Sequence, residues 1–320
     1  MSSKSFKLDL KKAKEIAETL HSQYKTGKRL FEKHKPPNYT PPSGMIAGSK
    51  GHALYLTYIF ALEQDADPSV LWKNATELYK ETQWFFDAEH ILTRSDEGLS
   101  KALVKLGVSD VNTSLKRWRE LSKILLENYS GDARNLPNKV PEPEFRKAIR
   151  EILGTKEDRQ IHRYLQLMAT YKLLKTKDLE NLGIFIDRNV AIYTLYTGVL
   201  RLDSEQFEGF LDGDPILSLT RKAWNESLAA TGVPPFELDD AIHIVSSKLC
   251  PKKKCLLCPV YEQCERDFNL EVDGNRIRLG GTKAAEHYTA TFCSRCGRDL
   301  PKGSRFCDGC GSETPKERPS

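Results

Sequence analysis

The segment from Cys250 to Cys264 reads CPKKKCLLCPVYEQC and holds four of the eight cysteines of the chain. Its C-x4-C-x2-C-x5-C spacing brings four thiolates close enough in sequence to surround one compact metal centre. Iron–sulfur proteins use tight cysteine gaps of this kind, with a proline beside one ligand. Zinc is the alternative, although structural zinc sites usually pair two C-x2-C knuckles and this segment has one. The pattern favours a [4Fe–4S] cluster bound by Cys250, Cys255, Cys258 and Cys264.

The other four cysteines form a second group near the end of the chain. Residues 292–311 read FCSRCGRDLPKGSRFCDGCG, which is C-x2-C-x10-C-x2-C with a glycine after each knuckle. Two such knuckles hold one tetrahedral Zn²⁺ ion, and each glycine permits the turn that directs sulfur inward. We therefore predict a zinc ribbon that contacts either nucleic acid or a protein partner. The predicted zinc ligands are Cys293, Cys296, Cys307 and Cys310.

Composition limits the class of protein to which the chain can belong. Its 320 residues are 39% hydrophobic and 29% charged, so the chain can bury a core and global disorder is excluded. No apolar run approaches the ~18 residues that span a bilayer, and residues 1–15 lack the apolar stretch of an export signal. We expect a cytoplasmic protein without membrane contact. In that reducing compartment, grouped cysteines indicate metal ligands rather than disulfides.

Upstream of the cysteines, apolar residues recur at helical spacing and strand-like alternation is nearly absent. Asp, Asn, Gly and Pro separate the periodic segments, as expected of turns between helices. The predicted fold class is therefore all-α. Helices are expected at about 4–34, 49–64, 68–81, 84–92, 97–105, 111–128, 142–152, 157–174, 187–200, 204–210, 214–230 and 236–248. The expected boundaries are a helical domain at 1–265 with the metal loop at 250–264, a linker at 266–291, the ribbon at 292–311 and a disordered tail at 312–320.

The loop at 250–264 directly follows a predicted helix and closes the helical domain. This arrangement, with Pro259 after the third cysteine, resembles the iron–sulfur loop of the helix-hairpin-helix DNA glycosylase superfamily, which includes endonuclease III and the adenine mismatch glycosylase. The first gap between cysteines is shorter here than in those relatives. The resemblance implies a two-lobed helical fold, and it implies phosphate contacts by Lys252, Lys253 and Lys254. A solvated lysine-rich surface is the alternative for these three residues.

Residues 182–200, LGIFIDRNVAIYTLYTGVL, resemble the same superfamily. There an apolar segment leads to an aspartate that opens a helix ending in Gly-Leu; here Asp187 opens the helix and Gly198 stands near its end. Taken alone, Asp187 is best interpreted as an ordinary helix N-cap, whose carboxylate accepts from free backbone N–H groups. Together with the cysteine loop downstream, the resemblance implies that Asp187 is the catalytic acid.

The hairpin of the superfamily should precede this aspartate. The nearest match is ILGTKED at 152–158, in which Gly154 is the only glycine available to bring the backbone close to a phosphate. The long connection from there to Asp187 resembles the archaeal 8-oxoguanine glycosylase branch. Bifunctional members carry a nucleophilic lysine near the hairpin, which implies that role for Lys156. A shift of the alignment by one turn places Gln160 there instead, and Lys156 is then a phosphate contact or surface residue.

The resemblance implies a cytoplasmic, nucleoid-associated prokaryotic enzyme, of the archaeal kind, that acts as a monomer on double-stranded DNA with a lesion. It would hydrolyse the N-glycosidic bond of a damaged or mismatched base after flipping the nucleotide out, and an accompanying lyase activity stays open. The degenerate hairpin favours the alternative of a non-catalytic DNA-binding or repair-adaptor protein, and an RNA-directed protein is a third reading. We assign core packing and no chemistry to the helix at 236–248.

Overall fold

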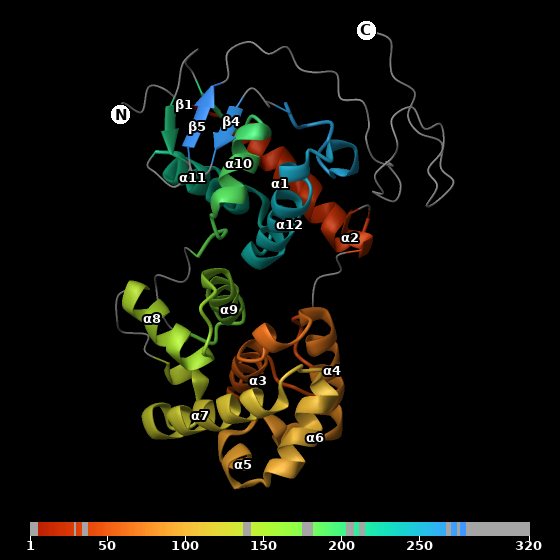
Figure 1. Ribbon diagram of the computed structural model, residues 1–320, viewed down its shortest axis with the longest axis vertical. Helices are drawn as coiled ribbons and strands as arrows, with labels where there is room; N and C mark the ends of the chain where they lie inside the picture. Colours follow the sequence, from red (N-terminus) through yellow and green to blue (C-terminus); the bar gives the residue numbers. More distant parts are fainter. Residues whose placement is uncertain are drawn as a thin grey trace, which may run out of the picture. The chain divides into compact units, whose positions relative to one another are not determined.

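The chain forms two compact units, one of which is inserted into the sequence of the other (Figure 1). The terminal unit comprises Met1–His34 and Gly183–Ser320, and the inserted unit comprises Lys35–Leu182. Both consist mainly of helices, which confirms the predicted fold class. The computed structural model describes residues 6–28, 30–33, 38–136, 142–174, 182–202, 208–210, 215–266, 270–273 and 276–279. Within these ranges, no helix combines the length and apolar character that a membrane crossing requires.

The inserted unit is built around one helix that is buried on all sides. This helix, α3 (Lys50–Phe60), is buried at every residue from His52 to Phe60, as expected of a central helix that lacks a polar face. The Phe60 ring meets the rings of Trp72 and Tyr164 edge-on, with centroids 5.4 Å apart in both pairs. The surrounding elements are η2 (Glu63–Asp65), α4 (Pro68–Glu81), η3 (Gln83–Phe86), α5 (Ala88–Thr93), α6 (Asp96–Leu106), α7 (Val111–Tyr129), η4 (Ala133–Asn135), α8 (Glu142–Leu153) and α9 (Asp158–Thr170).

In the terminal unit, segments from the two ends of the chain share one core. Helix α1 (Leu10–Lys25) packs against α11 (Ile216–Thr231) and α12 (Pro235–Lys248), and α10 (Arg188–Tyr196) packs against the same two helices. The Trp224 side chain is fully buried among them, and a large apolar side chain contributes about 1.5–3 kcal/mol when it is fully buried. Among the described residues of this unit, the remaining helical elements are helix α2 (Leu30–Lys33) and the 3-10 turns η6 (Cys250–Lys252) and η7 (Cys255–Leu257).

The terminal unit also contains short strands that the sequence did not predict. Strand β1 (Phe6–Leu8) pairs antiparallel with β2 (Leu200–Leu202). Strands β3 (Glu208–Phe210), β4 (Leu270–Asp273) and β5 (Arg276–Leu279) form a second antiparallel sheet in the order β3-β5-β4.

These strands correct three expectations. The helix expected at 4–34 begins only at Leu10, because the Asp9 side chain accepts from the backbone N–H of Lys12 at 3.0 Å and caps it there. The end of the helix expected at 204–210 is β3. Part of the linker expected at 266–291 is the β4–β5 pair.

Candidate metal centre and the neighbouring carboxylate

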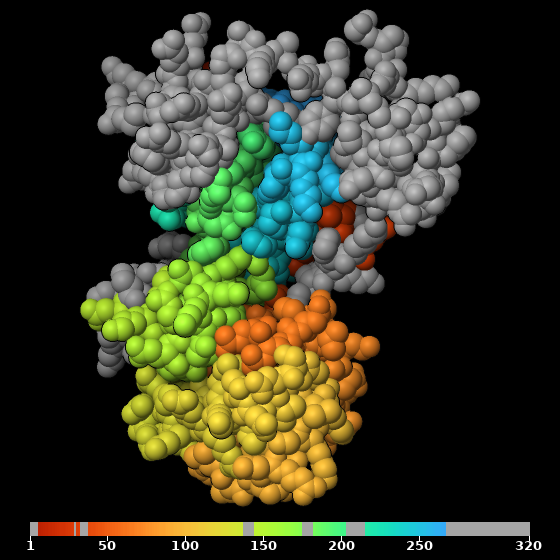
Figure 2. Space-filling model, viewed as in Figure 1, coloured from red at the N-terminus to blue at the C-terminus, as the bar shows by residue number. Residues whose placement is uncertain are grey.

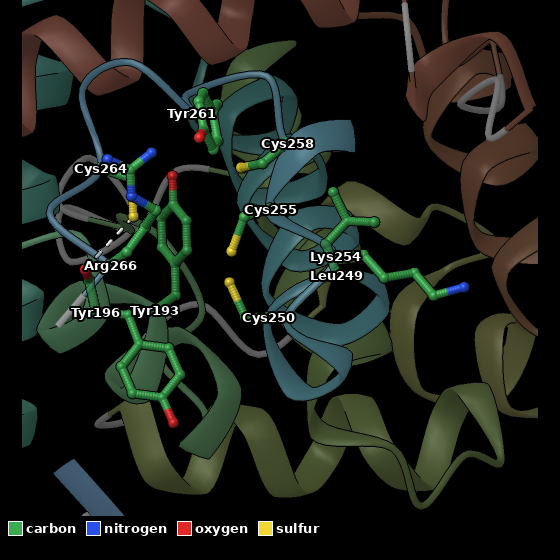
Figure 3. Close-up of a pocket in the computed structure, with 10 residues that line it drawn as sticks. All are labelled: Tyr193, Tyr196, Leu249, Cys250, Lys254, Cys255, Cys258, Tyr261, Cys264 and Arg266. Carbon is green, nitrogen blue, oxygen red and sulfur yellow. Dashed lines mark hydrogen bonds between the residues drawn. The ribbon is translucent and has the colours of Figure 1, made fainter. Parts of the chain in front are cut away.

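The four cysteines of the first group line one pocket in the terminal unit. The sulfur atoms of Cys250, Cys255, Cys258 and Cys264 border a small pocket that is partly open to solvent (Figure 3). The remaining lining residues are Tyr193, Tyr196, Leu249, Lys254, Tyr261 and Arg266. The structure therefore brings the four predicted ligands to one pocket, although they are spread over fifteen residues from Cys250 to Cys264.

After α12, the loop is shaped by backbone hydrogen bonds between residues that are close in sequence. The N–H of Lys254 donates to the carbonyl oxygen of Leu249 at 3.1 Å, and Lys253 adopts φ +49° to close the turn. Two further turns follow, in which Cys258 N–H donates to the Cys255 carbonyl at 2.8 Å and Cys264 N–H donates to the Val260 carbonyl at 3.0 Å. Lys252 and Lys253 are exposed on this loop, whereas Lys254 is half-buried against the pocket.

The end of the loop is fastened to the end of α10. The Cys264 thiol lies 3.4 Å from the carbonyl oxygen of Tyr196. The Glu265 carboxylate next to it accepts from Lys12 and Arg201 and thereby joins α1 and β2 to the loop. These two cations outweigh the cost of burial and lower the pKa of Glu265. The fastening fixes Cys264 against α10.

The backbone just after α10 requires a glycine beside the Glu265 ion pairs. Gly198 has φ +74°, a conformation that side chains disfavour. A Cβ atom at this position would lie 2.2 Å from Glu265 Oε2. Gly198, the glycine that the resemblance placed near the end of the helix, therefore marks a close approach of the backbone to the end of the cysteine loop.

The pocket disfavours thiolates that lack a compensating cation. Burial and the neighbouring cysteines raise the pKa of Cys250 well above its usual value. Burial, followed by the charge of Cys264, raises the pKa of Cys255 to about 11. Burial likewise raises the pKa of Cys264. The positive charges of Arg266 and Lys253 oppose the upward shift of the Cys255 pKa.

The four cysteine side chains line one pocket. Within the described ranges, no three His, Cys, Asp or Glu side chains are grouped so that they could hold one metal ion. All four sulfur atoms nevertheless face the same cavity. A donor set of four thiolates around such a cavity fits a multinuclear cluster with bridging sulfide.

Asp187 lies at the opposite end of the helix that borders this pocket. It is the N-cap of α10, and its Oδ1 atom accepts from the backbone N–H of Val190 at 2.9 Å, which confirms the predicted cap. The side chain is half-buried. Tyr193 and Tyr196 on the same helix line the sulfur pocket. Figure 2 shows α10 in green beside the segment from α12 into the cysteine loop in blue, and α10 contacts both α12 and η6.

Helix α12 contributes polar side chains to the surroundings of Asp187 that sequence reasoning missed. The buried Asp239 carboxylate accepts from the backbone N–H of Phe185 at 2.8 Å, just before the cap. One turn later, His243 Nδ1 lies 3.7 Å from Asp187 Oδ2. The prediction that this helix serves only as core was therefore incomplete. The i, i+4 spacing of Asp239 and His243 places both on one helix face and was the available signal.

The hairpin expected at 152–158 belongs to the inserted unit, where it joins α8 to α9. Gly154 has φ +63° and its carbonyl oxygen accepts from Gln64 Nε2 at 3.1 Å. Lys156 is exposed two residues later. Gln160, the alternative to Lys156, is buried and donates to the carbonyl oxygen of Phe60 at 2.7 Å. The Gln160 side chain is therefore held in the interior. Of these two candidates, Lys156 is the one that a ligand could approach.

Comparison with known proteins supports one part of the prediction directly. Residues 292–314 match the zinc-ribbon domain family, which confirms the predicted ribbon and supports a Zn²⁺ site there. Its four predicted ligands, Cys293, Cys296, Cys307 and Cys310, lie outside the described residues. The chain is thus a two-unit helical protein that ends in a zinc ribbon.

Neither of the remaining comparisons assigns the chain to a more particular protein. No curated protein matches it in sequence. Among solved structures, a thermostable thymine-DNA glycosylase aligns over 79% of this chain and 98% of its own, with 18% identity and a TM-score of 0.45. This similarity is too weak to indicate a function.

Proposed function

We propose that the protein is a DNA N-glycosylase that removes a damaged or mismatched base from double-stranded DNA. One observation carries the proposal: a half-buried aspartate caps α10, and the same helix borders a pocket lined by four cysteines. The sequence resemblance relates the same two features, an acid that opens a helix and an iron–sulfur loop that follows downstream. An isolated N-cap or an isolated cysteine loop would not distinguish this function from many others.

The pocket at Cys250–Cys264 is proposed to hold a [4Fe–4S] cluster. Its donor set of four sulfur atoms and its cavity fit that group, and the raised pKa values of Cys250 and Cys255 show that an additional positive charge would stabilise the thiolates. When bound, the cluster would cross-link the loop to the end of α12. The exposed side chains of Lys252 and Lys253 would then be presented by a rigid loop and could contact DNA phosphates.

The proposed chemistry begins with extrusion of the target nucleotide, because a duplex hides the glycosidic bond. Departure of the base leaves positive charge on the sugar, and a nearby carboxylate stabilises that charge and orients a water molecule. Asp187 supplies this carboxylate. Its Oδ1 atom accepts the hydrogen bond from the N–H of Val190, and Oδ2 is the carboxylate oxygen that does not take part in this cap.

Helix α12 would position this acid. Asp239 fixes the backbone at Phe185, two residues before the acid. His243 faces Asp187 Oδ2 at 3.7 Å, close enough for a small movement to form a charge-assisted hydrogen bond. We assign His243 a positioning role, since it acts through the carboxylate and not on the sugar.

The remaining assignments concern the inserted unit and the ribbon. The turn at Gly154 would bring backbone N–H groups to a phosphate, and Lys156 would attack the sugar if the enzyme is also a lyase. The zinc ribbon would supply a contact to DNA or to a protein partner. The enzyme is proposed to act as a monomer in the cytoplasm of a prokaryote and to stand near the archaeal 8-oxoguanine branch.

An excision screen tests the proposal. The full-length protein would be incubated with duplex oligonucleotides that carry 8-oxoguanine, uracil, thymine opposite guanine, hypoxanthine, or an alkylated base. Release of one of these bases is the expected result, and trapping by borohydride that is lost in Lys156→Ala would identify lyase chemistry. Tight binding of duplexes without release of any base would instead indicate the non-catalytic reader.

A further inference from the structure

A buried hydroxyl group on α10 lacks a hydrogen-bond partner beside the cysteine pocket. Tyr193 is 1% exposed, and its hydroxyl oxygen makes no hydrogen bond to any described residue. A buried hydroxyl without a partner costs about 1–3 kcal/mol, so such groups usually have an acceptor in the functional state of the protein. The pocket that Tyr193 lines is where that acceptor should be sought.

The Tyr193 ring is held in place by its surroundings. It stacks on Trp224 with a centroid separation of 5.9 Å and an interplanar angle of 20°. Trp224 is itself fixed, because its Nε1 atom donates to Thr194 Oγ1 at 2.9 Å. The hydroxyl therefore cannot swing to solvent without breaking this packing. Figure 3 shows the ring of Tyr193 beside the sulfur atoms of the cysteine loop.

The cysteine sulfur atoms are the acceptors that share this pocket with Tyr193. Cys250, Cys258 and Cys264 line it together with the Tyr193 side chain. A protonated thiol is a weak acceptor, whereas thiolate or sulfide in a negatively charged metal centre accepts hydrogen bonds readily. The missing partner is thus explained if the hydroxyl is arranged for the metal-loaded pocket.

We propose that the Tyr193 hydroxyl donates a hydrogen bond to sulfur of the iron–sulfur centre and stabilises its more reduced, more negative state. The inference rests on the proposed [4Fe–4S] cluster. A hydrogen bond to cluster sulfur raises the midpoint potential, because it offsets the charge of the added electron. Removal of the hydroxyl should therefore shift the potential to a more negative value.

Tyr196 provides a matched control within the same pocket. It lies three residues further along α10 and also lines the cavity, but Figure 3 shows its hydroxyl directed away from the sulfur atoms. The experiment compares the wild type, Tyr193→Phe and Tyr196→Phe, each reconstituted with iron and sulfide, by potentiometric titration. We expect a negative shift of the midpoint potential in Tyr193→Phe and none in Tyr196→Phe. Equal potentials in wild type and Tyr193→Phe would overturn the inference.

A second measurement tests the hydrogen bond by exchange of its proton. Resonance Raman bands of the Fe–S stretches should shift when the wild-type protein is exchanged into D₂O, because a donated hydroxyl proton is replaced by deuterium. The shift should be smaller in Tyr193→Phe, and an unchanged wild-type spectrum would contradict the inference. A wild-type protein that binds no iron after reconstitution would refute the proposed cluster itself. Neither result depends on whether any base is excised.

Discussion

Asp187 and Tyr193 stand six residues apart on α10, where the first caps the helix and the second borders the sulfur pocket. At 1.5 Å per residue their backbones are separated by about 9 Å along the helix axis. Fewer than two helical turns thus connect the proposed catalytic acid to the proposed metal centre. A disturbance of the pocket that moves α10 should therefore also move the Asp187 carboxylate.

Loss of one sulfur ligand should remove the cluster. Cys250→Ala leaves three thiolates facing the cavity, and we expect the iron content to fall from roughly four atoms per chain to near zero, with a lower melting temperature. Iron and zinc would be measured by elemental analysis, together with the absorbance near 400 nm. Cys293→Ala is the matched control and should lose zinc while it retains iron. A colourless wild-type protein with two zinc ions would contradict the assignment.

Removal of the His243 imidazole should slow excision without weakening DNA binding. Because His243 Nδ1 faces Asp187 Oδ2 at 3.7 Å, His243→Gln should lower the single-turnover rate by roughly tenfold, while the Kd for duplex DNA stays the same. The control is His21→Gln. The His21 imidazole on α1 lies 2.6 Å from the carboxylate of Glu237 on α12, and we assign it no part in excision.

Double variants distinguish positioning from a general structural effect. If His243 acts through the carboxylate, His243→Gln should cost little further activity once Asp187→Asn is present. Additive losses would show that the two residues act independently and would remove the positioning role.

The stability of the inserted unit should fall as the pH drops below about 6.5. Burial lowers the pKa of His52 to about 4, so the unfolded chain binds a proton at a higher pH than the folded chain does. The stability that comes from keeping the His52 imidazole neutral is fully present above pH 6.5 and is lost progressively toward pH 4. It amounts to about 3 kcal/mol. Urea titrations at several pH values measure this difference.

His52→Gln serves as the comparison, because it removes the titrating group from the centre of α3. Its unfolding free energy should change less between pH 7 and pH 4 than that of the wild type. Parallel curves for both proteins would show that His52 does not account for the pH dependence.

Alanine at Gly198 should destabilise the terminal unit by more than backbone strain alone. The positive φ costs about 1–2 kcal/mol for a residue with a side chain, and the new Cβ would collide with the Glu265 carboxylate. Gly232→Ala is a matched control, since Gly232 has φ +68° at the end of α11 and open space around it. Denaturant unfolding should give the larger loss for Gly198→Ala, and equal losses would argue against the close approach.

The sequence predicted features that depend on neighbours within one or two turns. Apolar periodicity located most helices, and the Asp187 cap is satisfied by Val190, three residues away. The four-cysteine pocket was also predictable because its ligands lie in one short loop.

Features made by distant partners were not predictable. Strand β1 has three residues, too few for an alternating pattern, and its partner β2 lies near the middle of the chain. The apolar spacing of its helix predicts core packing for His243, and the carboxylate that it faces caps another helix.

The central claim is that Asp187 performs base excision and does not merely cap a helix. Asparagine is an equally good N-cap, so Asp187→Asn should leave the unfolding free energy within about 0.5 kcal/mol of the wild type. Asp110→Asn, at the cap of α7 with Thr113 N–H at 3.0 Å, makes the same substitution away from the proposed chemistry. Single-turnover excision on the best substrate is the decisive measurement. We predict that Asp187→Asn loses at least about a thousandfold in rate while Asp110→Asn retains the wild-type rate. Excision by Asp187→Asn at the wild-type rate would contradict the account.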